Sequence, residues 1–204
     1  MKQQYLVADT RVVDETIVNK SRFICYLAPC QSSEAAKAHL EEVRQLHPNA
    51  SHHCYAFISS FPEDSQSYGF SDDGEPTGTA GRPMLAVLQG SGIGEISAIV
   101  VRYFGGTKLG TGGLQRAYGG SVREALTKMN TRVKVPMANR KVLCQYAQVN
   151  DILRLVEQFE GKVLSQAFQT DVELCIAIPI VQVEHFADAL TTLSAGQLAL
   201  QELN

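Results

Sequence analysis

The residues best suited to chemistry lie in a glycine-rich stretch, SAIVVRYFGGTKLGTGGLQRAYGGS, at residues 97–121. Ten of the chain's 16 glycines lie between Gly90 and Gly120. Glycine loses more conformational entropy on folding than other residues, so this density indicates backbone that turns tightly or approaches another group closely. A helix that begins behind such a loop offers free N–H groups and the positive end of its dipole, which suits an anion. Lys108 and Arg116 would add positive charge at the same place.

The stretch differs from the known nucleotide-binding loops. The Gly-x-x-x-x-Gly-Lys-Ser/Thr string of a P-loop does not occur, and Gln115 stands where the dinucleotide fingerprint has its third glycine. We therefore predict an anion site of general type; the alternative is that the glycines only let a helix pack tightly on a strand. The predicted nucleic-acid- or anion-binding residues are Arg102, Gly105, Gly106, Lys108, Gly110, Gly112, Gly113, Arg116, Arg123 and Lys128.

A second group of candidate residues lies in the long polar stretch from Phe61 to Pro83. A loop of this length inside a compact domain is usually functional or disordered. Its carboxylates could bind a hard cation through oxygen, although they lack EF-hand spacing. Asp and Thr also form turns and helix caps, and Thr79 could cap a helix over residues 82–89. The motif residues of undetermined role are Asp72, Asp73, Glu75, Thr77, Thr79 and Arg82.

The charge of the chain is segregated along the sequence. The net charge of −3 by itself argues against a nucleic-acid-binding protein, but residues 102–141 carry nine basic side chains and one glutamate. This basic segment begins at the glycine stretch and could attract a polyanion locally. The alternative is a solvated helix face that lies against acidic parts of the same chain.

The sequence gives no indication of a membrane-spanning segment, a signal peptide, a zinc site or a disulfide framework. No apolar run approaches the ~20 residues that span a bilayer, and the first residues lack the apolar core of a signal peptide. The five cysteines are scattered without a CxxC pair, so neither a zinc site nor a disulfide framework is indicated. We expect buried free thiols in a cytoplasmic protein.

The elements that must position these residues follow from hydrophobic periodicity. Strands are predicted at 11–18, 21–28 and 52–60, a helix from Ser32 or Ser33 to Leu46, a central strand around 99–101, and a helix over 113–129. Residues 130–139 contain Pro136 and no clear periodicity, which indicates a linker. The remainder is predicted as a strand at 141–148, a helix capped by Asn150, a hairpin of 162–168 with 171–178, a helix at 181–193 and a strand at 198–202. That βαββαβ order is the ferredoxin-like arrangement.

Three strings carry a resemblance to a known family. SDDGEPTGTAGRP at residues 71–83, VRYFGG at 101–106 and LGTGGL at 109–114 are long and unusual. They resemble the IMPACT family, and the whole chain is similar to its bacterial two-domain members. The resemblance implies an α+β protein: an N-terminal ribosomal-protein-S-five domain-two-like domain at 1–130, a linker at 131–139 and a ferredoxin-like domain at 140–204. It implies no catalytic residue that can be placed on this chain.

The expected function is therefore a non-catalytic RNA- or ribosome-binding protein that modulates translation, with a translation factor or other protein as a further possible partner. No cofactor, metal or membrane partner is predicted. Two alternatives stay open: an enzyme on a phosphorylated small molecule or peptide, with a metal held by Asp72, Asp73 and Glu75, or a protein-interaction module. The enzyme would require the polar stretch at residues 61–83 (the acidic loop) to fold back onto the loop of the glycine-rich stretch, residues 105–113 (the glycine loop).

Overall fold

A computed structural model describes residues 4–64 and 66–203. The chain divides into two compact units, one of Tyr5–Lys134 and one that contains the chain from Val135 onward. The elements of the first unit are β1 (Tyr5–Ala8), β2 (Val12–Val18), β3 (Ser21–Pro29), α1 (Ser33–Leu46), β4 (His52–Ile58), β5 (Tyr68–Ser71), α2 (Gly81–Ser91), β6 (Ile93–Gly94), β7 (Ile96–Tyr103), α3 (Gly110–Leu126) and β8 (Thr131–Lys134).

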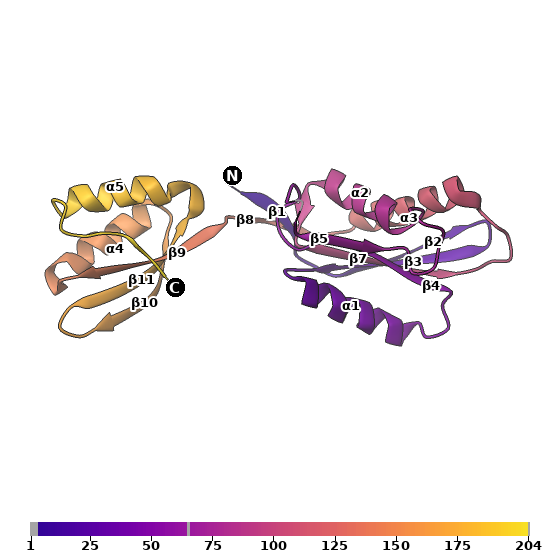
Figure 1. Cartoon of the computed structure of the whole chain (residues 1–204), viewed down its shortest axis with the longest axis horizontal. Helices are drawn as coiled ribbons and strands as arrows, with labels where there is room; N and C mark the ends of the chain where they lie inside the picture. Colours follow the sequence, from indigo (N-terminus) through magenta and orange to yellow (C-terminus); the bar gives the residue numbers. More distant parts are fainter. Residues whose placement is uncertain (1–3, 65, 204) are drawn as a thin grey trace. The chain divides into compact units, whose positions relative to one another are not determined.

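A five-stranded antiparallel sheet forms the centre of the first unit, with strand order β2-β3-β7-β4-β5. Helix α1 lies on one face of the sheet, and α2 and α3 lie on the other (Figure 1). Strand β7 is central and covered on both sides, so every residue from Ile96 to Arg102 is buried. This explains its nearly continuous apolar sequence, because a strand that is buried on both faces does not alternate.

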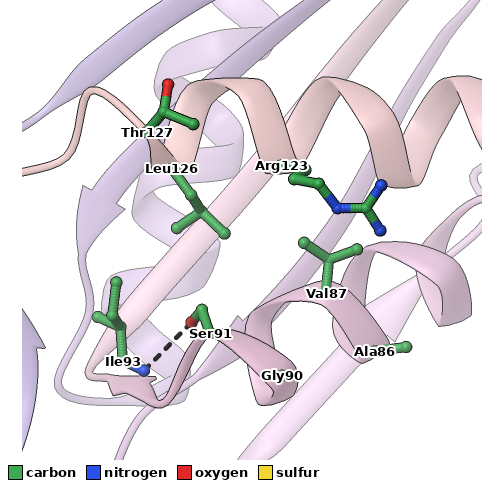
Figure 2. Close-up of a pocket in the computed structure, with 8 residues that line it drawn as sticks. All are labelled: Ala86, Val87, Gly90, Ser91, Ile93, Arg123, Leu126 and Thr127. Atoms are coloured by element: carbon green, nitrogen blue, oxygen red, sulfur yellow. Dashed lines mark hydrogen bonds between the residues drawn. The ribbon is translucent and has the colours of Figure 1, made fainter.

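Helices α2 and α3 lie beside each other above the sheet and leave a shallow hollow of about 570 Å³ between them. Figure 2 shows the hollow, with Val87 from α2 facing Leu126 and Arg123 from α3. Most of its lining is apolar, and the guanidinium of Arg123 supplies charge at its edge.

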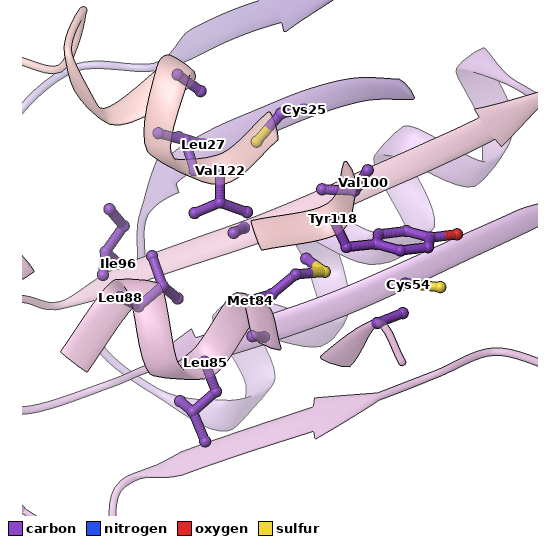
Figure 3. Close-up of a cluster of buried hydrophobic side chains, with 14 of the residues drawn as sticks. Cys25, Leu27, Cys54, Met84, Leu85, Leu88, Ile96, Val100, Tyr118 and Val122 are labelled. Carbon is purple, nitrogen blue, oxygen red and sulfur yellow. The ribbon is translucent and has the colours of Figure 1, made fainter. Parts of the chain in front are cut away.

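The core of the first unit lies between these two helices and the sheet. Met84, Leu85 and Leu88 of α2 and Tyr118 and Val122 of α3 meet the side chains of β3, β4 and β7 there (Figure 3). A smaller cluster on the opposite face joins α1 to the same sheet. All five cysteines are buried and free, as the sequence predicts.

Three short strands form a second sheet in this unit, with order β6-β1-β8. Strand β8 pairs with β1 over four residues, from Thr131 opposite Ala8 to Lys134 opposite Tyr5. The predicted linker over 131–139 is therefore wrong in its secondary structure. Only Val135 and Pro136 lie between β8 and the next strand, which begins at Met137. The sequence did not indicate this strand because four residues give only a weak β-strand signal and because the partner strand lies more than 120 residues earlier in the chain.

The second unit has the ferredoxin-like βαββαβ order. Its elements are β9 (Met137–Cys144), the 3₁₀ turn η1 (Tyr146–Gln148), α4 (Val149–Gln158), β10 (Lys162–Phe168), β11 (Val172–Pro179), the 3₁₀ turn η2 (Ile180–Gln182), α5 (Val183–Leu193) and β12 (Gln201–Glu202). The sheet order is β10-β11-β9-β12, all antiparallel. Helices α4 and α5 cover one face, where Ile152, Ile176 and Phe186 are fully buried.

The remaining differences from the predicted elements are small. Strand β5 and the start of α2 occupy part of the predicted loop at 61–83, and Gln148 rather than Asn150 precedes the first residue of α4. Within the described residues, no helix is both long and apolar enough to cross a membrane.

Candidate anion-binding site

The glycine loop connects the end of β7 to the start of α3, as the sequence predicts. Gly105 packs directly against the turn between β2 and β3: a Cβ at this position would lie 2.0 Å from the carbonyl carbon of Lys20. Gly110 has φ +69°, a backbone conformation that L side chains rarely adopt. Gly105 thus serves close packing, and Gly110 serves the bend into the helix.

The first turn of α3 has no side-chain cap in the part of the chain that the structure describes. Leu109 occupies the cap position and makes no side-chain hydrogen bond to the helix, and the first turn contains no acidic residue. Thr111 and Gly112 are exposed there. The Arg116 guanidinium folds back toward this turn, with Nη1 3.8 Å from the position that a Cβ on Gly112 would occupy. The positive end of the α3 dipole and the Arg116 guanidinium therefore both favour an anion at this turn.

The basic segment is largely neutralised by ion pairs. Arg102, Lys128, Arg132, Lys134, Arg140 and Lys141 each have a carboxylate partner. The other three cations of the segment, Lys108, Arg116 and Arg123, are exposed, and no carboxylate within the described part of the chain lies at ion-pair distance from them. Arg116 and Arg123 are two helical turns apart and therefore share one face of α3.

Two of the predicted phosphate contacts are paired with carboxylates of the protein itself, and one of them, Arg102, is buried. Arg102 is only 6% exposed, because it projects from the doubly covered β7, and its Nη1 donates to Glu75 Oε1 at 2.6 Å. Lys128 pairs with Asp14 at 2.5 Å. Arg102 is therefore not available to a polyanion, whereas Lys128, whose side chain is 57% exposed, is held only by a surface ion pair.

The acidic loop is held by a buried network around Glu75. Oε1 of Glu75 accepts hydrogen bonds from Arg102 and, at 2.7 Å, from the hydroxyl of Tyr118; Nε2 of His52 lies 3.8 Å from the same oxygen. Burial, followed by the neighbouring Cys54 and Glu75, raises the pKa of the Tyr118 hydroxyl, so it remains a donor. Figure 3 shows the Tyr118 ring lying over the sheet near Cys54. A buried carboxylate needs this degree of compensation.

Asp72 caps helix α2, the role that the sequence assigns to Thr79. Its carboxylate accepts hydrogen bonds from the backbone N–H groups of Gly78, Ala80 and Gly81 at 2.8–2.9 Å. Burial opposes ionisation, but these three donors lower the pKa of Asp72 below its usual value. The Thr79 hydroxyl instead donates to the carbonyl of Pro76 at 2.6 Å.

The metal site of the enzyme alternative is not supported. Asp73 is also engaged, because it accepts from the backbone N–H of His53 at 2.7 Å and pairs with Arg44. Across residues 4–64 and 66–203, no group of three or more His, Cys, Asp or Glu side chains is placed to hold a metal ion. The ring nitrogens of the adjacent His52 and His53 bond to different carbonyls: His52 Nδ1 donates to the carbonyl of Asp73, while His53 Nε2 donates to that of His47. Thr77 and Arg82 are exposed.

The acidic loop does fold back onto the glycine loop. Gln115 Nε2 of α3 donates to the carbonyl of Gly78 at 3.3 Å. A cavity of about 370 Å³ opens where the two loops meet. Its lining residues are Glu75, Pro76, Arg102, Phe104, Lys108, Leu109, Gly110, Thr111 and Leu114. The sequence indicates this contact only as a requirement of the enzyme alternative, and the complementary charges of Glu75 and Arg102 are the signal that supports it.

Comparison with known proteins places the chain among sequences with the same two units. The family model for the Impact N-terminal domain matches residues 19–126, and the model for a Domain of unknown function (DUF1949) matches residues 142–197. An "IMPACT family member" of Haemophilus influenzae is 48% identical over 98% of this chain and 97% of the relative.

Two further relatives and a solved structure agree with this. The "IMPACT family member YigZ" of Escherichia coli is 50% identical over 95% of this chain and 94% of its own length. The "IMPACT family member YvyE" of Bacillus subtilis is 31% identical over 99% and 92%, respectively. The crystal structure of a hypothetical protein, 46% identical, superposes with a TM-score of 0.75 and covers 100% of this chain and 99% of that one.

Proposed function

The chain belongs to the IMPACT family, and from the geometry of its glycine loop we propose that it is a non-catalytic protein that binds RNA or the ribosome and thereby modulates translation. The observation that carries the proposal is the set of exposed cations at the start and along one face of α3. Among the described residues, Lys108, Arg116 and Arg123 have no carboxylate at ion-pair distance, whereas the neighbouring cations are paired within the protein.

The proposed contacts are to phosphates. Two of the cations, Lys108 and Arg116, lie beside the uncapped first turn of α3, where the helix dipole also favours negative charge. Phosphate contacts fix a nucleic acid in place without reading its bases. We therefore expect this surface to bind RNA of different sequences with similar affinity and with strong salt dependence.

Co-sedimentation with ribosomes at low and high salt tests the proposal. The double variant Lys108→Glu/Arg116→Glu is compared with Arg154→Glu/Lys162→Glu, which makes the same change in net charge at exposed positions of the second unit. We expect the loop variant to lose binding and the control variant to retain it. With about three phosphates engaged, the slope of log K against log salt should be about −2 to −3 in a titration with RNA.

The proposal fails if the wild-type protein binds neither RNA nor ribosomes at low salt. It also fails if the control variant weakens binding as much as the loop variant does, because the effect would then reflect net charge rather than the α3 surface.

A further inference from the structure

The cavity between the acidic and glycine loops combines features that a polyanion surface alone does not need. Phosphate binding requires exposed cations, yet this cavity of about 370 Å³ is walled mainly by apolar groups, including Pro76, Leu109 and Leu114. Its volume is within the range of pockets that enclose small organic ligands. The cavity therefore suits a ligand that has an apolar or aromatic body as well as a charge.

Phe104 provides a flat apolar surface in this cavity. It follows directly after β7 and is 52% exposed. The guanidinium carbon of Arg102 lies over its ring, 5.5 Å from the ring centroid. Since the guanidinium covers one face and half of the side chain is still exposed, the ring can stack on a second planar group. Arg102 thus holds the Phe104 ring in place. Its Nη1 is paired with Glu75 and does not contact the ligand.

Polar groups meet this apolar surface at one side. Lys108 and Thr111 line the cavity at the uncapped start of α3. Arg102 also lines the cavity, and its buried Nε has no hydrogen-bond partner among the residues that the structure describes. The charge of Glu75 is compensated by Arg102 and Tyr118, so the remaining charge at the cavity is the positive charge of Lys108.

From this arrangement we infer that the cavity binds one unpaired nucleotide of a single RNA strand, with its base stacked on Phe104 and its phosphate beside Lys108 and the first turn of α3. This inference rests on the proposed RNA-binding function and specifies its ligand. Bases within a duplex are already stacked and paired, whereas a single strand can turn a base outward onto an aromatic side chain. Stacking accepts every base, so the site selects an unpaired strand rather than a sequence.

Fluorescence anisotropy with two labelled RNAs of equal nucleotide number tests the inference. One is a single-stranded oligonucleotide of about 12 nucleotides, and the other is a hairpin whose loop is replaced by a non-nucleotide linker, so that every base is paired. Wild-type protein should prefer the single strand. Phe104→Leu should weaken single-strand binding roughly tenfold, which is typical of the loss of one stacked base, and should leave hairpin binding unchanged.

Three comparisons make the result specific. Phe168→Leu replaces a comparably exposed phenylalanine of the second unit, at 57% exposure, and should change neither affinity. Phe104→Tyr keeps an aromatic ring and should retain single-strand binding, which separates stacking from any effect of Phe104→Leu on folding. Lys108→Glu/Arg116→Glu should weaken binding of both RNAs, because it removes phosphate contacts.

The possible outcomes distinguish this inference from the proposed function. Equal affinity for both RNAs, together with no effect of Phe104→Leu, would overturn the nucleotide site and leave phosphate binding by α3 intact. No binding of either RNA by the wild type would overturn both. Adenosine monophosphate serves as a separate probe: if it binds as tightly as the oligonucleotide and equally depends on Phe104, the ligand is a free nucleotide and the inference of an RNA strand is wrong.

Discussion

Asp72 and Glu75 lie three residues apart in the acidic loop, but they act on different parts of the fold. Asp72 accepts hydrogen bonds from the backbone N–H groups of Gly78 in the loop, of Ala80 at the cap position of α2 and of its first residue, Gly81. Glu75 is buried against Arg102 and Tyr118. Replacing one partner of a buried ion pair leaves the other charge uncompensated, which is costly. Both carboxylates therefore hold the acidic loop in position for the cavity, rather than forming a site for a cation.

The cap made by Asp72 gives a prediction about stability and pH. Asp72→Asn should lower the free energy of unfolding at neutral pH by about 1 to 2 kcal/mol, because an amide replaces the charged acceptor of the three N–H groups at and before the start of α2. The pKa of Asp72 is lower in the folded protein than its usual value of 3.8, so its contribution is complete above that pH. It is lost as the pH falls through the lower folded pKa.

Urea unfolding of wild type and Asp72→Asn between pH 2 and pH 7 measures this effect. The two curves should converge in acid, where the wild-type carboxylate is also protonated. Asp188→Asn changes an exposed carboxylate of α5 and controls for the loss of one negative charge. A difference between wild type and Asp72→Asn that stayed constant down to pH 2 would contradict the role of the ionised cap.

At the scale of elements, helix α3 and the loop before it contain glycines with opposite expected effects on stability. A Cβ on Gly120 would meet no atom within 4 Å, and its φ is not positive. Gly120→Ala should therefore stabilise the first unit by about 0.5–1 kcal/mol, since glycine is a poor helix former. In the loop before the helix, Gly105→Ala should destabilise the unit, because the new Cβ would overlap the backbone of Lys20. Thermal unfolding of both variants should shift the midpoint in opposite directions, and a shift in the same direction would contradict this distinction.

The elements with a strong periodic pattern could be predicted from the sequence. Strands β2, β3 and β7 and helix α1 agree within a few residues, as does the βαββαβ order of the second unit. Strands β1, β6 and β8 were missed because they contain two to four residues each and pair across long sequence separations. Periodicity identifies one face of an element, but it does not identify a partner elsewhere in the chain.

The same limit applies to the candidate site. The glycine loop and the exposed Lys108, Arg116 and Arg123 follow from local sequence, so they could be named in advance. Arg102 could not be separated from them, because its burial depends on Glu75, 27 residues earlier in the chain. The acidic loop resembled a metal site for a similar reason. Its carboxylates are engaged by backbone N–H groups and by side chains that are distant in sequence, and the spacing of residues along the chain does not reveal these contacts.

At the scale of the whole molecule, each unit has a hydrophobic core of its own. The clusters around Tyr118 and Val43 contain residues of the first unit, and the cluster around Phe186 contains residues of the second. A separate core is the physical requirement for independent folding. The position at which the chain can be divided then depends on β8, because this strand lies at the end of the first unit and pairs with its first strand.

This pairing predicts different stabilities for two fragments. A fragment of residues 1–134 should unfold cooperatively, whereas a fragment of residues 1–130 should melt at least about 5 °C lower. The shorter fragment loses the β1–β8 ladder and the ion pairs of Arg132 with Asp9 and Lys134 with Glu95. Circular dichroism melting measures the difference, with a control in which residues 131–134 of the longer fragment are replaced by Gly-Ser-Gly-Ser. If all three fragments melted at the same temperature, residues 131–134 would act as a linker, as predicted from the sequence. A lower melting temperature in only the shorter and the replaced fragments would assign these residues to the first unit.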